Sequence, residues 1–158
     1  MSRPADGLAH PIPLLAVAAL LLNDHVLKGG PAPGWLTGKL SDLAGMVFFP
    51  LFLQAAGEWL AARMGRPWGP SRRALLGSAV ATALVFSLVQ VWPLATEAYR
   101  WGLGLLQWPP RQALALLGGR GWIDVAPVAV TPDPTDLLTV PFVVVAVAVG
   151  WRRARPTA

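Results

Sequence analysis

The stretch Ala74–Trp92, ALLGSAVATALVFSLVQVW, decides the class of this protein. It contains 19 residues without a single charge, and a helix of about 20 mostly apolar residues is what crossing the hydrocarbon core of a bilayer requires. The rest of the chain agrees, because 54% of its 158 residues are hydrophobic and only 13% are charged. Soluble domains of this size are much more polar. We therefore expect an integral membrane protein.

Three further segments are apolar enough to cross a bilayer, which places the predicted spans at about residues 11–28, 43–62, 74–92 and 134–153. The last span begins at Pro134, since Asp133 suits a helix N-cap and proline suits the first helical position. Two apolar pieces within residues 99–122, separated by Pro109-Pro110, are too short to cross and predict interfacial helices. The expected fold is one all-α polytopic membrane domain over residues 1–158: a bundle of four transmembrane helices with short interfacial helices in the third loop.

The basic residues predict the orientation of these spans. Eight of the 13 Lys and Arg residues lie in the N-terminus, the second loop and the C-terminus, whereas the other five share their side with six acids. Short loops rich in Lys and Arg remain in the cytoplasm, so both termini are expected there. The net charge of +5 is then an orientation signal and does not require a nucleic-acid partner.

A cleaved signal peptide is the alternative for the first apolar segment. Arg3 is its only early positive side chain, and no small-x-small cleavage site follows before Asn23. We therefore expect the first segment to remain as a span.

The openings of the second and fourth predicted spans share a pattern. Thr37–Leu43 (TGKLSDL) and Thr131–Leu137 (TPDPTDL) both fit Thr-x-x-x-[Ser/Thr]-Asp-Leu. Hydroxyl and carboxylate groups at a helix start cap its exposed N–H groups, which is the simpler explanation. The alternative is an internal repeat of two helix pairs.

Polar residues also gather at the far end of the first predicted span, on the same side of the membrane. Charges this close to a span pair with each other, snorkel to the interface or line a functional site. We therefore expect one outward-facing polar pocket, with His25, Asp42 and Asp136 as neighbours around it. Its candidate ligand-binding residues are Asn23, Asp24, His25, Lys28, Lys39, Ser41, Asp42, Asp133 and Asp136.

The alternative to this pocket is an interfacial ion pair between Asp24 and Lys28, with His25 among the lipid headgroups. At the inner end of the second span, Glu58 is expected to snorkel beside Arg63, and an ion-pathway role is its alternative.

Several chemistries are excluded or unsupported. The chain has no cysteine and only two histidines, which excludes disulfides, thiolate metal sites and cysteine nucleophiles. The segment Gly34–Ser41 falls short of a phosphate loop, because it has one residue too few between its glycines and Leu40 where the hydroxyl should follow the lysine.

The motifs Asn23-Asp24-His25, Trp35–Asp42 (WLTGKLSD) and Asp133–Leu137 (DPTDL) resemble a group of small bacterial integral membrane proteins of unknown function. More remotely, the layout is similar to VanZ-type proteins, which are implicated in glycopeptide-antibiotic tolerance and carry charged motifs at the openings of spans two and four. The second span here lacks the Asp-Lys-x-x-His of that group. These resemblances imply a multi-pass protein of the bacterial inner (cytoplasmic) membrane.

Three functions from different classes fit these features. The leading hypothesis is a non-enzymatic envelope protein whose pocket binds a lipid headgroup or cell-wall precursor, with Lys28 and Lys39 facing its phosphate. Its expected partners are membrane lipids. No cofactor is predicted, and a divalent metal at Asp133 and Asp136 is left open.

The second hypothesis is a membrane enzyme acting on a lipid-linked substrate, with His25 as general acid or base and Asp24 or Asp42 orienting it. In that case Asp133 and Asp136 would hold the metal. The third is an ion- or proton-coupled permeation subunit. Four spans would need to oligomerise for that role, which leaves a homo-oligomer open.

Overall fold

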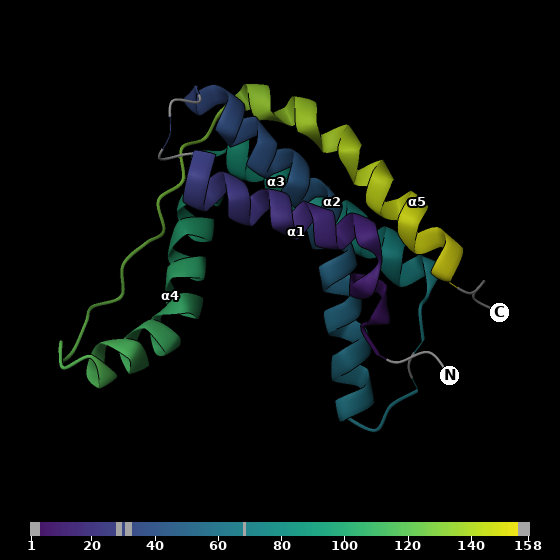
Figure 1. Ribbon diagram of the computed structural model, residues 1–158, viewed down its shortest axis with the longest axis horizontal. Helices are drawn as coiled ribbons and strands as arrows, with labels where there is room; N and C mark the ends of the chain where they lie inside the picture. Colours follow the sequence, from purple (N-terminus) through teal and green to yellow (C-terminus); the bar gives the residue numbers. More distant parts are fainter. Residues whose placement is uncertain (1–3, 28–29, 31–32, 68, 155–158) are drawn as a thin grey trace. The chain divides into compact units, whose positions relative to one another are not determined.

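The computed structural model describes residues 4–27, 30, 33–67 and 69–154. All elements in these ranges are helices (Figure 1). Lys28 lies outside the described residues, as does the side chain of Asp24. In chain order the elements are the 3₁₀ turn η1 (Asp6–Ala9), α1 (Pro11–Leu22), the π-helical turn η2 (Asn23–Leu27), α2 (Gly34–Arg63), α3 (Arg72–Val91), α4 (Pro93–Leu117), the 3₁₀ segment η3 (Pro134–Phe142) and α5 (Val143–Arg153).

Three helices of the described chain are long and apolar enough to cross a membrane: Gly34–Arg63, Arg72–Val91 and Pro134–Arg153, the last formed by η3 and α5 together. The prediction of a multi-pass helical membrane protein is confirmed to that extent. The first predicted span is a shorter apolar helix, in which the 12-residue α1 is continued by the five-residue η2. A fourth crossing and the four-helix bundle stay predictions.

The chain divides into two compact units, Met1–Phe86 with Asp136–Ala158, and Ser87–Thr135. Within the first unit α1 runs antiparallel to α2, because Asn23 contacts the beginning of α2 and Ala5 contacts its end. Proline at position 50 lies inside α2, and Figure 1 shows this helix bending along its length, as expected where a backbone hydrogen bond is lost.

Small side chains let the helices of the first unit approach closely. Ala16 of α1 packs against Ala44 and Val47 of α2. A second cluster joins Leu51, Leu75 and Ala146 of α2, α3 and α5. Without a hydrophobic driving force between helices in lipid, such close van der Waals packing is what holds them together.

The second unit contains α4 and an extended segment that returns along it (Figure 1). The prediction of two short helices separated by Pro109-Pro110 is wrong, because both prolines lie inside the 25-residue α4. Side chains of α4 on either side of the prolines bind the extended segment: Trp108 Nε1 donates to the carbonyl of Ile123 at 2.8 Å, and Gln112 Oε1 accepts from the N–H of Ile123 at 2.8 Å. The segment packs on Gly104 so closely that a Cβ there would lie 2.2 Å from the carbonyl oxygen of Ala126.

Candidate functional site

Asn23 fastens the end of α1 to the beginning of α2. Its side chain is fully buried, and Nδ2 donates to the carbonyl of Thr37 at 2.7 Å and to Oγ of Ser41 at 2.6 Å. A buried N–H donor is costly unless it is hydrogen-bonded, so the two bonds made by Nδ2 fix the register between the two helices. Two of the predicted site residues, Asn23 and Ser41, are thereby brought together.

Lys39 and Asp136 join the two span openings that share a sequence pattern. Lys39 Nζ lies 2.8 Å from Asp136 Oδ1, across 97 residues of sequence. The side chains are 29% and 13% exposed, so the pair is partly accessible from outside the protein. The hydroxyl of Thr139 donates to the carbonyl of Asp136 at 2.7 Å and holds the first turn of η3 in place. The contact draws the openings of α2 and η3 to one level.

Three other predicted site residues, His25, Asp42 and Asp133, lie in different segments of the chain. His25 is exposed in η2, and Asp42 is half-buried in α2. Asp133 belongs to the second unit, where its N–H donates to Gln90 Oε1 at 3.0 Å. The neighbourhood of His25, Asp42 and Asp136 stays a prediction.

The metal hypothesis gains no support from the geometry that is described. Among the described residues, no group of three or more His, Asp or Glu side chains could hold a metal ion. A site made from Asp133 and Asp136 therefore stays a prediction.

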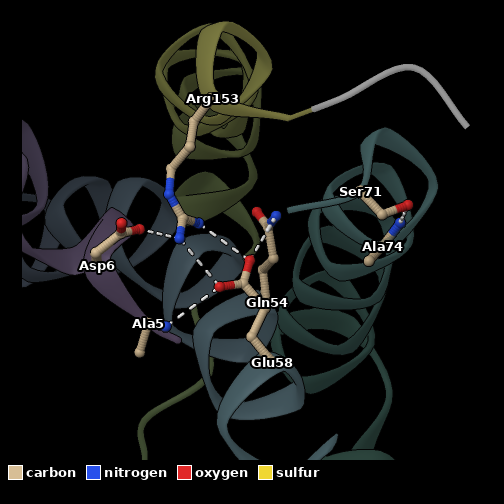
Figure 2. Close-up of polar contacts among 7 residues, drawn as sticks. All are labelled: Ala5, Asp6, Gln54, Glu58, Ser71, Ala74 and Arg153. Carbon is tan, nitrogen blue, oxygen red and sulfur yellow. Dashed lines mark hydrogen bonds and ion pairs between the residues drawn. The ribbon is translucent and has the colours of Figure 1, made fainter. Parts of the chain in front are cut away.

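A second polar centre, which the sequence did not predict, lies near the other end of α2 (Figure 2). Arg153 of α5 donates from Nη1 to Glu58 Oε1 at 3.0 Å and from Nη2 to Oε2 at 3.1 Å. Gln54 Nε2 and the N–H of Ala5 complete the hydrogen bonds of this carboxylate, each at 3.2 Å. Asp6 pairs with Arg153 from the other side. The Glu58 side chain is only 5% exposed.

The prediction that Glu58 snorkels beside Arg63 is wrong. The guanidinium of Arg63 lies 5.5 Å from the ring centroid of Trp59, in a cation–π contact, and Glu58 is buried against Arg153. A signal for this pairing was present, because Glu58 and Arg153 both lie near the inner ends of predicted spans. A buried acid so close to a span needs a cation at its own depth.

The two ion pairs connect the same helices at matched positions. Glu58 follows Lys39 by 19 residues, whereas Arg153 follows Asp136 by only 17. Six of the latter steps lie in the 3₁₀ segment η3. Since a 3₁₀ helix rises about 2.0 Å per residue and an α-helix about 1.5 Å, both axial paths measure about 28 Å. This is close to the thickness of about 30 Å of a bilayer core. The two helices therefore run in the same direction, with an ion pair at each end and with opposite polarity.

Two cavities adjoin the Glu58–Arg153 pair. The α2–α3 cavity, of about 580 Å³, is lined by Glu58, Gln54 and Ser78 and otherwise by apolar or small residues such as Gly57 and Gly77. The N-terminal cavity, of about 560 Å³, is lined by Arg153, Asp6, His10 and again Gln54. Glu58 faces one cavity and Arg153 the other, so the ion pair stands between them.

Comparison of the chain with protein-family models, with curated proteins and with solved structures found no match. The fold and the two polar centres define a helical membrane protein whose α2 and η3–α5 are joined by an ion pair at each end. What it does is inferred from these centres.

Proposed function

We propose that this protein belongs to the bacterial inner membrane and binds the phosphate of a lipid headgroup, or of a lipid-linked cell-wall precursor, at its outer polar centre. The outer polar centre comprises Asn23, Thr37, Lys39, Ser41 and Asp136. The observation that carries the proposal is the Lys39–Asp136 pair, which holds a partly exposed lysine side chain at the opening of two span-length helices.

The directions of the helices support a topology in which α1, α2, α3 and η3–α5 cross the membrane one after another. Because α1 is antiparallel to α2, and η3–α5 is parallel to α2, a chain that starts in the cytoplasm crosses outward in α1 and inward in α2. It crosses outward again in α3 and returns in η3–α5. This proposal places both termini in the cytoplasm, as the basic residues predict.

The chemistry of Lys39 favours a phosphate. An ammonium has three donors and no acceptor, and lysine is a common phosphate ligand. Asp136 orients this ammonium, and the lysine side chain is 29% exposed, so an anion can reach it from outside the protein. The centre lies at one end of an axial path of about 28 Å, close to the thickness of about 30 Å of a bilayer core, which suits a position at the level of the headgroup phosphates.

Native mass spectrometry of the full chain in mild detergent tests the proposal. The probes are phosphatidylglycerol and a polyprenyl phosphate, with an uncharged diacylglycerol as the reference. We expect both phosphates to bind at least tenfold more tightly than diacylglycerol. Preference for the polyprenyl phosphate would identify a lipid-linked precursor as the ligand, whereas preference for phosphatidylglycerol would identify a membrane lipid.

The matched variants are Lys39→Gln and Arg152→Gln. Arg152 is exposed at the opposite end of η3–α5, so its loss should leave binding unchanged. Lys39→Gln should lower the affinity for both phosphates at least tenfold. Equal binding by this variant and the wild type would overturn the proposal. The enzymatic and permeation hypotheses stay predictions.

A further inference from the structure

The two residues of the Glu58–Arg153 pair differ in the number of ion-pair partners that are described for them. Arg153 contacts two carboxylates, Glu58 and Asp6, whereas the ion pairs described for Glu58 come from Arg153 alone. Figure 2 shows the guanidinium between these two acids, with Glu58 also held by Gln54 and by the N–H of Ala5.

This difference in partners decides whether an anion or a cation can displace one residue of the pair. An anion that displaced Glu58 from Arg153 would leave a carboxylate of 5% exposure without a counter-charge. Removing one partner from a buried pair is strongly unfavourable. A cation that displaced Arg153 from Glu58 would instead leave Arg153 beside Asp6 and Glu58 beside the ligand. Every charge then keeps a partner of opposite sign, so the centre selects a cation.

We propose that the α2–α3 cavity binds an amphiphilic amine whose ammonium takes the place of Arg153 on the carboxylate of Glu58. This site lies near the end of α2 opposite Lys39 and is independent of the proposed phosphate site.

The lining of the cavity suits both parts of such a molecule. Glu58 is the only charged residue among the described residues that line it, and Gln54 and Ser78 add a carbonyl and a hydroxyl that accept ammonium hydrogens. Gly57 and Gly77 leave room for an apolar body, since a Cβ at either position would meet nothing within 4 Å. A volume of about 580 Å³ falls within the range of about 300–1,000 Å³ that small-molecule pockets have.

Isothermal titration of the full chain in mild detergent tests this site with three probes of similar shape and different charge. The probes are 2-phenylethylamine, 2-phenylethanol and 3-phenylpropanoate, each corrected for its heat of mixing with empty micelles. We expect the amine to bind at least tenfold more tightly than the alcohol or the carboxylate. Binding of the carboxylate as tight as that of the amine, or no binding of the amine, would overturn the proposal.

Variants of the carboxylate locate the binding. Glu58→Gln should lower the amine affinity at least tenfold. Glu97→Gln, which neutralises an exposed carboxylate of α4 in the second unit, should leave the affinity unchanged. Amine affinity that is the same in Glu58→Gln as in the wild type contradicts the proposal.

Two further variants keep the test decisive if Glu58→Gln does not fold. Gly77→Leu fills the cavity without touching the ion pair and should abolish amine binding, with Gly102→Leu of α4 as the control, since neither glycine has a neighbour within 4 Å of a built Cβ. Asp6→Asn removes the acid that would receive the displaced Arg153, so amine binding should weaken. Unchanged binding in both Gly77→Leu and Asp6→Asn would refute the site.

Discussion

The guanidinium of Arg153 makes a two-point contact with the carboxylate of Glu58, 95 residues earlier in the chain, at 3.0 and 3.1 Å. Two parallel N–H···O bonds of this kind fix both distance and orientation. At the other end of the same helices, Lys39 contacts Asp136. Here α2 carries the positive charge, whereas in the Glu58–Arg153 pair it carries the negative one. A shift of η3–α5 along α2 by one helical turn would break both contacts, so the pairs define a single register.

The first prediction is that the two partners of the buried pair are unequal in their effect on stability. Arg153→Met leaves the carboxylate of Glu58 buried without its ion-pair partner and should lower the free energy of unfolding by about 3–5 kcal/mol. Glu58→Gln leaves Arg153 paired with Asp6 and should cost less, about 1–3 kcal/mol. Denaturation followed by tryptophan fluorescence measures both.

Arg152→Met is the control for this comparison, because the neighbouring arginine is exposed. Its effect should stay within about 0.5 kcal/mol, as for other surface substitutions. A larger loss of stability in Glu58→Gln than in Arg153→Met would show that Asp6 does not support Arg153.

The second prediction concerns the coupling between Lys39 and Asp136. In a double-mutant cycle of Lys39→Met and Asp136→Asn, the two effects should fail to add by about 1 kcal/mol, as expected for a partly exposed ion pair. Raising the salt concentration should shrink this coupling energy, because screening weakens pairs that water reaches. Additive effects at low salt would mean that the pair does not hold the two openings together.

The third prediction uses two glycines of α4 two positions apart. Replacing glycine by alanine inside a helix ordinarily stabilises it by about 0.5–1 kcal/mol, and Gly102→Ala should do so since its Cβ meets nothing within 4 Å. Gly104→Ala should destabilise, because its Cβ would fall 2.2 Å from a backbone oxygen of Ala126.

Displacement of that extended segment should also separate Trp108 from Trp122, whose rings lie 5.1 Å apart. Near-ultraviolet circular dichroism reports the change. Identical spectra and stabilities for the two alanine variants would show that the extended segment does not pack on α4.

The fourth prediction is the orientation of the protein in the membrane. The natural chain has no cysteine, so single cysteines at Ser71 and Thr131 can be labelled without a background. In intact cells, a membrane-impermeant maleimide should label Thr131→Cys, and Ser71→Cys should react only after the cells are opened. Labelling of both positions in intact cells would contradict the predicted topology.

The sequence determined the class of the protein, because spans are encoded locally. An uncharged run such as Ala74–Trp92 has few alternatives to a membrane helix, and Asp133-Pro134 marks a helix start. Two of the three span-length helices lie within two residues of where hydropathy places them. The third, α2, begins at Gly34, nine residues before the predicted span, so Thr37, Ser41 and Asp42 lie inside the helix and do not cap its start. Orientation and function depend on counts and motifs and stay predictions.

Only the tertiary structure decided which polar groups meet. Asp136 and Glu58 each lie at a span end with several basic residues predicted on the same side of the membrane, and only the packing of the helices decides that Lys39 and Arg153 are their partners. That choice depends on the direction of η3–α5 beside α2 and on the longer rise per residue of a 3₁₀ helix, which brings 17 residues of one helix level with 19 of the other. The continuity of α4 through two prolines was also decided by the tertiary structure, where Trp108 and Gln112, on either side of the prolines, both bind the backbone of Ile123.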